Sequence, residues 1–262
     1  MHPILLTIGG LSLYSYGAAV ALGGLLSFGI WSAQREKMGL RKDDDLWMLV
    51  NAILLGGFVG GRILYLLEYE TWFGPGFWSA AFALNRGFSV LGAFFGVTGA
   101  VWLFSRRAQV GFFRILDHVA LAAPLWHVFG RLGCFAAGCC YGRPSERAWS
   151  VAFTDPRAMV PAELLGRRLH PAQLYEAGGD LAIFLFLLLW VRPRVGSGRW
   201  SYGGTSGAYL TAYGALRFAL EPFRGDTVPA GLGFSAGQWL AAALVASGLA
   251  LTYRSYHRCI RH

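Results

Sequence analysis

Residues 170–191, HPAQLYEAGGDLAIFLFLLLWV, decide the fold, because the second half of this stretch is apolar throughout. A helix that crosses a bilayer needs about 20 mostly apolar residues. The segment 172–191 meets this requirement, and so do 14–33, 46–67, 88–105, 112–131, 203–222 and 235–254. The sequence therefore predicts an all-α integral membrane protein with seven transmembrane helices.

The composition agrees with a membrane protein. The 262 residues are 55% hydrophobic and only 14% charged, whereas a soluble domain carries about 25% charged residues. The net charge of +9 also suits a nucleic-acid-binding protein, but membrane proteins concentrate Lys and Arg in cytoplasmic loops. We therefore expect no nucleic acid as a partner. The first residues lack a basic region before an apolar one, so no removable signal peptide is expected.

The loop charges predict an orientation. Lys and Arg gather in 34–45, 106–114, 192–199 and the C-terminal tail, which share one side of an alternating seven-helix bundle. The positive-inside rule makes that side cytoplasmic. The longest polar stretch, 133–169, falls on the other side and is expected to form a small head. We expect one domain over 1–262 in a bacterial inner membrane, with the N-terminus and head periplasmic and the C-terminus cytoplasmic.

Charged side chains inside the predicted helices are candidates for function. Arg62, Arg131, Arg217 and Glu221 lie within or at the ends of spans, where insertion scales put the cost at about 2.5–3.5 kcal/mol each. For Arg62 and Arg131 the alternative is snorkelling to the interface. The run GGFVGGR (56–62) also has two overlapping GxxxG spacings, which predict close helix packing.

On the sixth predicted helix, Tyr213, Arg217 and Glu221 are spaced by four residues and share one face. Arg224 follows one turn later. The pair of Arg217 and Glu221 could simply neutralise itself. We favour the reading that Glu221 orients a guanidinium whose fork binds a phosphate through two hydrogen bonds.

The segment GRLGCFAAGCCYGRP (130–144) is the richest in glycine and charge. Its glycines allow close backbone approach, and arginines stand near both ends. In HPAQLYEA (170–177), polar residues recur at every third position near a helix start, which favours an anion. Together these segments predict a site for an anionic lipid headgroup. The substrate-binding residues expected are Arg62, Gly133, Gly142, Arg143, His170, Gln173, Glu176 and Arg224.

Cys134, Cys139 and Cys140 cluster on the predicted outer side. Outer cysteines face an oxidising compartment, so we expect a disulfide between Cys134 and one neighbour. A redox relay is an alternative. A metal site would need more ligands than this run supplies, unless His127 or His170 contributed, so no metal is expected. No organic cofactor is implied.

Several segments together resemble one family. They are SYG (15–17), GGRILY (60–65), GRLG (130–133), YGRP (141–144), HPAQLYEA (170–177), YGALRFALEPFRGD (213–226) and SAGQWL (235–240). In this order they resemble the prolipoprotein diacylglyceryl transferase family over nearly the whole chain. The colinear order is more specific than any single motif.

The resemblance implies a reaction: the diacylglyceryl group of phosphatidylglycerol, or of a similar anionic phospholipid, moves to the lipobox cysteine thiol of a preprolipoprotein signal peptide. Glycerol phosphate leaves as an anion, so arginines would stabilise its charge. A thiol has an unperturbed pKa near 8.5, so a base would help to form the thiolate. By position, the catalytic residues implied are Tyr16, Arg131, Tyr213, Arg217 and Glu221.

Two departures from the family pattern stand out. Leu91 occupies the position where the family usually has a histidine, and leucine accepts no proton. Cys134 and Ala137 stand where asparagines are typical, and Cys139 stands where glutamate is common. Cysteine and alanine cannot reproduce those hydrogen bonds.

His127 is the candidate base, because it lies one helical turn before Arg131; a packed histidine is the alternative. His170, Glu221 or water could also take the proton. Three functions follow: the family's usual transfer, a diverged paralogue with another acceptor or thiol-based chemistry, and a non-catalytic lipid-binding membrane protein.

Overall fold

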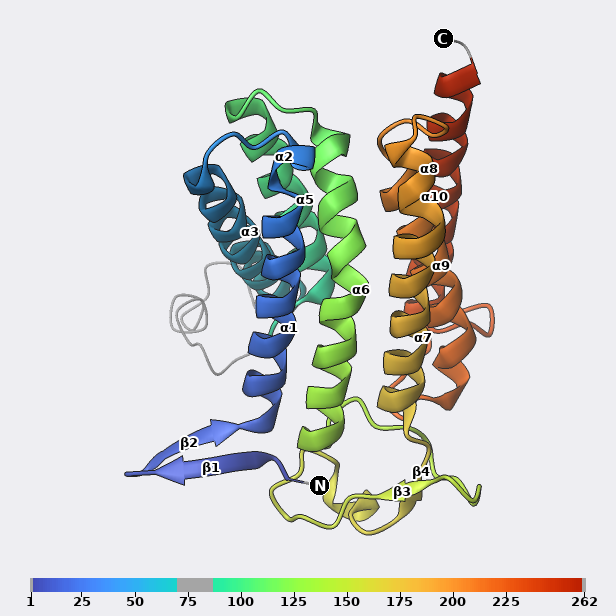
Figure 1. The fold of residues 1–262 in the computed structure, drawn as a ribbon. Helices are drawn as coiled ribbons and strands as arrows, with labels where there is room; N and C mark the ends of the chain where they lie inside the picture. Colours follow the sequence, from blue (N-terminus) through green and yellow to red (C-terminus); the bar gives the residue numbers. More distant parts are fainter. Residues whose placement is uncertain (1, 70–86, 261–262) are drawn as a thin grey trace. The chain divides into compact units, whose positions relative to one another are not determined.

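The computed structural model describes residues 2–69 and 87–260. The chain is mostly helical, and its short strands form two antiparallel pairs (Figure 1). It divides into two compact units, one made of 1–30 and 119–262 and the other of 31–118.

The first unit, 1–30 with 119–262, opens with an antiparallel hairpin of β1 (Ile4–Ile8) and β2 (Leu11–Tyr14). The first part of α1 (Ser15–Ala33) and the last part of α6 (Phe112–Ala137) belong to it. These helices pack closely: a Cβ on Gly23 would lie 2.8 Å from Phe129 Cβ, and Trp126 Nε1 donates to the Val20 carbonyl at 3.0 Å.

The same unit contains one long helical stretch from residue 172 to 196. It consists of α7 (Ala172–Phe186), the π-helical η2 (Leu187–Val191) and α8 (Arg192–Gly196). The π turn precedes Pro193, which has no N–H to donate and whose ring crowds the preceding turn, so the wider turn accommodates it. Two further helices follow, α9 (Gly204–Leu220) and α10 (Ala236–Ile260), with the 3-10 turn η3 (Glu221–Phe223) after α9.

The second unit, 31–118, contains α2 (Arg35–Met38), α3 (Asp43–Tyr69) and α5 (Val90–Arg107). Helices α3 and α5 touch through glycines. A Cβ on Gly60 would lie only 2.4 Å from the Gly92 carbonyl oxygen, and one on Gly56 would lie 2.7 Å from the Gly96 carbonyl oxygen. The close packing predicted from the GxxxG spacing is confirmed.

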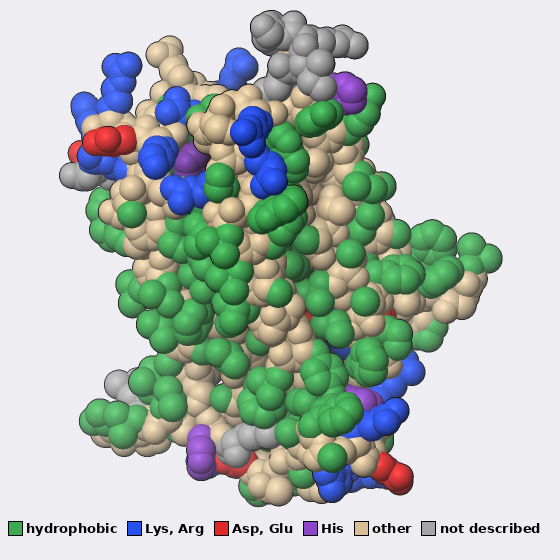
Figure 2. Space-filling model, turned by 45° about the vertical axis from the view of Figure 1, so that its right-hand side comes forward, with side chains coloured by type: hydrophobic (Ala, Val, Ile, Leu, Met, Phe, Trp, Pro, Cys, Tyr) green, Lys and Arg blue, Asp and Glu red, His purple; other side chains and the backbone are tan. Residues whose placement is uncertain are grey.

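Among the described residues, five helices are long and apolar enough to cross a membrane: Ser15–Ala33, Asp44–Glu68, Phe112–Ala137, Ala172–Gly196 and Ala236–Arg258. The helices α5 and α9 occupy the other two predicted positions. Large apolar side chains on these helices are exposed, for example Leu55 at 63% and Leu189 at 68%. Figure 2 shows apolar side chains over much of one face, with Lys and Arg gathered in patches. Such exposure fits lipid rather than water.

A small lobe without long helices lies between α6 and α7, at the same end of the first unit as the β1–β2 hairpin (Figure 1). It contains β3 (Val151–Ala152), η1 (Ala162–Leu164) and β4 (Arg168–Leu169). Its own core is formed by Phe153, Val160 and Leu169. The lobe occupies most of the stretch for which the sequence predicted a head, and we call it the head; its periplasmic side stays a prediction.

The predicted start of the head, residue 133, is wrong by several residues. Helix α6 continues to Ala137, and Gly138 ends it with a left-handed φ of +80° and an N–H bonded to the Cys134 carbonyl at 2.8 Å. Gly133 therefore lies inside the helix. A Cβ there would come within 3.1 Å of Tyr16 Cα, so Gly133 allows α1 and α6 to approach closely rather than forming a loop.

Candidate functional site

Three arginines from three segments of the first unit converge on Glu176, in the second turn of α7. Nη2 of Arg131 lies 2.7 Å from its Oε2. Nη1 of Arg224 lies 2.6 Å from its Oε1, and Nη1 of Arg217 lies 3.6 Å from the same oxygen. Glu176 is 3% exposed. We call Arg131, Arg217, Arg224 and Glu176 the guanidinium cluster.

Two further carboxylates pair with the Nη2 atoms of Arg217 and Arg224, whereas Glu176 pairs with their Nη1 atoms. Glu221 Oε2 lies 2.9 Å from Arg217 Nη2, so the ion pair expected from the four-residue spacing is present. Glu221 Oε1 accepts a hydrogen bond from the Ser235 hydroxyl. Asp226 pairs with Arg224 at 2.7 Å. Burial alone would lower the pKa of Arg224, but Glu176 and Asp226 raise it above its ordinary value, so this guanidinium stays charged.

One donor of the cluster is not used. Arg217 Nη1 is buried and donates no hydrogen bond within the described part of the chain, although Glu176 neutralises it from 3.6 Å. A buried donor without an acceptor is unfavourable. This nitrogen is therefore prepared to donate to an oxygen that a ligand brings.

His127 lies on α6 one turn before Arg131, next to a buried carboxylate. Its Nδ1 is 3.9 Å from Asp180 Oδ1 and 3.4 Å from the Tyr209 hydroxyl, and its ring centroid lies 5.1 Å from that of Tyr213. Asp180 is 1% exposed, and neither of its oxygens accepts a hydrogen bond from a described residue. Asp180 was missed by sequence reasoning, although a carboxylate within a predicted span is itself a signal of function.

The predicted substrate-binding residues near the head hold the polypeptide around the cluster. Gln173 Nε2 donates to the Cys139 carbonyl at 2.8 Å, and Arg143 Nε donates to the Arg224 carbonyl at 2.9 Å. His170 Nδ1 lies 3.1 Å from the Tyr175 hydroxyl. A Cβ on Gly142 would lie 2.2 Å from the His170 carbonyl oxygen. These contacts fix the start of α7 and the segment after η3; direct contact of these residues with a substrate stays a prediction.

Three other residues of interest lie away from these contacts. Tyr16, in the first turn of α1, is 46% exposed and interacts electrostatically with Arg131. Arg62 and Leu91 belong to the second unit. Arg62 is buried and its Nη1 donates to the Gly87 carbonyl at 2.7 Å. Its role in binding substrate stays a prediction.

The three clustered cysteines are free thiols, so the structure does not contain the expected disulfide. The sulfur atoms of Cys134, Cys139 and Cys140 all lie within 4.8 Å of one another. Hydrogen bonds from the Cys134 and Cys139 thiols lower the pKa of Cys140 below its ordinary value. The proximity predicted from the sequence is confirmed.

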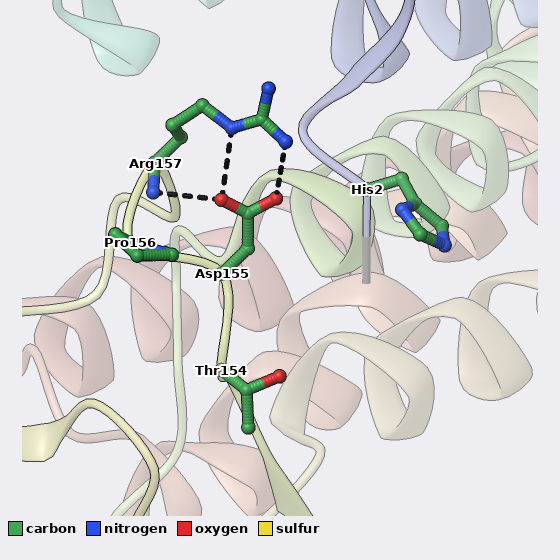
Figure 3. A pocket seen from close by; sticks show the side chains of 5 residues that line it. All are labelled: His2, Thr154, Asp155, Pro156 and Arg157. Carbon is green, nitrogen blue, oxygen red and sulfur yellow. Dashed lines mark hydrogen bonds and ion pairs between the residues drawn. The ribbon is translucent and has the colours of Figure 1, made fainter.

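An open depression at the head has no such chemistry. It is lined by His2, Thr154, Asp155, Pro156 and Arg157 (Figure 3). Arg157 donates to the Asp155 carboxylate from its backbone N–H at 2.9 Å, from Nε at 3.0 Å and from Nη2 at 2.8 Å. These bonds lower the pKa of Asp155 to about 2. Since Arg157 already satisfies the carboxylate, we assign no function to this depression.

Fold and site together define a multi-pass membrane protein in which three arginines meet around one buried glutamate near the ends of its helices. The family model for prolipoprotein diacylglyceryl transferase matches residues 3–254. The chain is 33% identical over 228 residues to a Clostridium tetani protein, with 86% of each chain covered. It is 34% identical over 272 residues to a Bordetella avium protein, covering 99% of this chain and 96% of the relative.

A Solidesulfovibrio magneticus protein is 35% identical over 247 residues, covering 91% of this chain and 86% of its own length. All three relatives carry the name phosphatidylglycerol–prolipoprotein diacylglyceryl transferase. The chain belongs to the prolipoprotein diacylglyceryl transferase family. The resemblance drawn from the sequence motifs is confirmed.

Proposed function

We propose that this protein transfers the diacylglyceryl group of phosphatidylglycerol to the cysteine thiol of a prolipoprotein. Membership of the transferase family sets the reaction class. The main support from this structure is that Arg131, Arg217 and Arg224 converge on one buried carboxylate, Glu176. Three fixed guanidiniums suit the phosphate of an anionic lipid.

The reaction needs positive charge where the bond breaks. The acceptor sulfur attacks the glyceryl carbon that carries the phosphate, a C–S bond forms, and the C–O bond breaks. The electron pair of that bond goes to the phosphate oxygen, and glycerol phosphate leaves. Arg131 and Arg217 hold the phosphate, with the unused Nη1 of Arg217 donating to one of its oxygens. Glu221 and Glu176 orient the two guanidiniums.

His127 takes the proton of the acceptor thiol. Leu91 cannot do so, and His127 has the surroundings of a base. Its Nδ1 faces Asp180 and Tyr209, which leaves Nε2 as the nitrogen that accepts the thiol proton. Asp180 is a positioning residue: its carboxylate favours the Nδ1–H tautomer and stabilises the imidazolium once it forms.

Tyr16 and Tyr213 complete the site toward the headgroup or the acceptor. Tyr16 is half exposed near Arg131, and Tyr213 lies against the His127 ring. The signal peptide of the prolipoprotein supplies the acceptor thiol. We further propose seven transmembrane helices, adding α5 and α9 to the five apolar ones. The head and N-terminus then face the periplasm and the C-terminus the cytoplasm, with the whole chain as one domain.

The test uses the purified full-length protein in vesicles of phosphatidylglycerol and phosphatidylcholine, with a synthetic peptide that contains a lipobox cysteine. Mass spectrometry should detect the peptide with a diacylglyceryl group attached. Vesicles of phosphatidylcholine alone, and a peptide with serine in place of cysteine, should give no product. An absence of product from folded protein in phosphatidylglycerol vesicles would reject the proposal.

Two variants test the proton acceptor. His127→Asn should lower the transfer rate by about 10²–10⁴-fold, the usual contribution of a positioned base. His257→Asn is the matched control, since His257 lies near the end of α10 and its ring contacts Tyr253 and Tyr256 rather than Asp180. If His127→Asn transfers at the wild-type rate, His127 is not the base.

A further inference from the structure

We propose that Cys134, Cys139 and Cys140 form a binding site for one thiophilic divalent metal ion of the zinc class. The three residues are free thiols, and their sulfur atoms all lie within 4.8 Å of one another. Thiolates are soft ligands that select such ions. The proposed metal site adjoins the guanidinium cluster through Arg131 and Arg224, but the proposal does not depend on the transfer reaction.

The spacing of the sulfurs fits coordination. A zinc–sulfur bond is about 2.3 Å long, so three sulfurs around one ion are separated by about 4 Å. The three thiols can reach that arrangement with shifts of about 1 Å or less from their observed spacing. A disulfide would require two sulfurs to approach to about 2.05 Å and would leave the third unused. A single ion engages all three.

The backbone holds the thiols in place from two sides. Gly138 reverses the chain after α6, and Cys140 itself has a left-handed φ of +54°, which is uncommon for a residue other than glycine. Gln173, fully buried on α7, donates to the Cys139 carbonyl at 2.8 Å. The next residues are fixed by the bridge between Gly142 and Arg224. Such constraints keep ligands arranged before the ion binds.

Charge balance also favours the site. Binding replaces three S–H protons, which go to solvent, by a divalent cation, so the occupied site carries one net negative charge. Arg131 and Arg224, which also pair with Glu176, interact electrostatically with Cys140 and so offset part of that charge. Three sulfur ligands leave the fourth tetrahedral position for a water molecule.

Cadmium is the probe, because cadmium–thiolate bonds absorb in the ultraviolet. The full-length protein is prepared with Cys259→Ser, which leaves only the three clustered thiols. We expect one Cd²⁺ per chain, with the charge-transfer absorption of thiolate ligands. Cys139→Ser and Cys140→Ser should each weaken Cd²⁺ binding by at least about 10–100-fold. Replacing a residue that only hydrogen-bonds to a metal ligand already costs that much affinity, and here a ligand itself is lost.

Two controls make the result decisive. Cys134 is buried in α6, so the less buried Cys139 and Cys140 variants give the main comparison, and thermal unfolding confirms that each is folded. Unchanged Cd²⁺ affinity in both variants overturns the proposal. So does a count of only one free thiol in protein purified without reductant, which would show a disulfide. Because transfer activity is not measured, neither outcome bears on the proposed reaction.

Discussion

Replacing Glu176 by glutamine removes the negative charge that Arg131, Arg217 and Arg224 share, while it keeps the size of the side chain. The three guanidiniums then face one another around a neutral amide. Their partners Glu221 and Asp226 remain, but these pair with the Nη2 atoms of Arg217 and Arg224 rather than with the Nη1 atoms near Glu176. The repulsion therefore falls at the centre of the guanidinium cluster.

The size of the effect follows from burial and distance. Glu176 is 3% exposed and approaches two of the arginines to 2.6 and 2.7 Å. Removing one partner of a buried ion pair costs about 3–5 kcal/mol, because the remaining charge stays buried without compensation. In a chain of this size, 1 kcal/mol shifts the melting temperature by about 2–4 °C. We expect the apparent melting temperature of Glu176→Gln to fall by about 6–20 °C.

The proposed function adds a second expectation. If the cluster binds a lipid phosphate, phosphatidylglycerol can supply the charge that Glu176→Gln lacks. Adding this lipid to detergent-solubilised protein should raise the melting temperature of the variant more than that of the wild type, and phosphatidylcholine should not. Glu163→Gln, an exposed substitution in the head, is the control. Equal effects of the two lipids, or an unchanged melting temperature, would refute the reasoning.

Three further changes test the site and the fold. Arg217→Ala should slow transfer to the lipobox peptide by about 10²–10³-fold, and Arg217→Lys should recover only part, because an ammonium lacks the planar fork. Asp180→Asn should lower kcat for transfer at least tenfold with little change in KM for the lipid. It should also raise the melting temperature, because the substitution removes a buried carboxylate that accepts no hydrogen bond from a described residue. A parallel fall in stability would mark Asp180 as structural. Gly60→Val should lower the melting temperature by forcing α3 from α5, whereas Gly99→Ala, with open space around it, should not.

Local patterns made part of this structure predictable. Apolar runs of about 20 residues gave the helix positions, the GxxxG spacing gave the α3–α5 contact, and the four-residue spacing gave the pair of Arg217 and Glu221. Each of these three predictions depends on residues that are close in sequence or on a single periodicity. The fourth span was expected to end at residue 131, whereas α6 continues to Ala137 and Gly133 lies inside it, against Tyr16.

The centre of the cluster was not predictable in the same way. Glu176 was expected to line the start of the fifth helix, but its partners Arg131 and Arg217 lie far from it along the chain. The spacing of residues within one helix does not predict a contact between side chains of different helices. It depends on how α6, α7 and α9 are arranged. Asp180 could have been found, because a lone carboxylate in an apolar span is costly and marks function.

If the guanidinium cluster binds the lipid phosphate as proposed, its charge balance bears on catalysis as well as on stability. Three arginines face three carboxylates, so the site is close to neutral before lipid arrives. It therefore binds a phosphodiester, which carries one negative charge, with only moderate affinity. As the C–O bond breaks, the phosphate becomes a monoester and gains a second negative charge. The guanidiniums then interact more strongly with the transition state than with the bound lipid, and only such a difference accelerates the reaction. An additional arginine charge here should tighten lipid binding and retard release of glycerol phosphate, rather than speed the transfer.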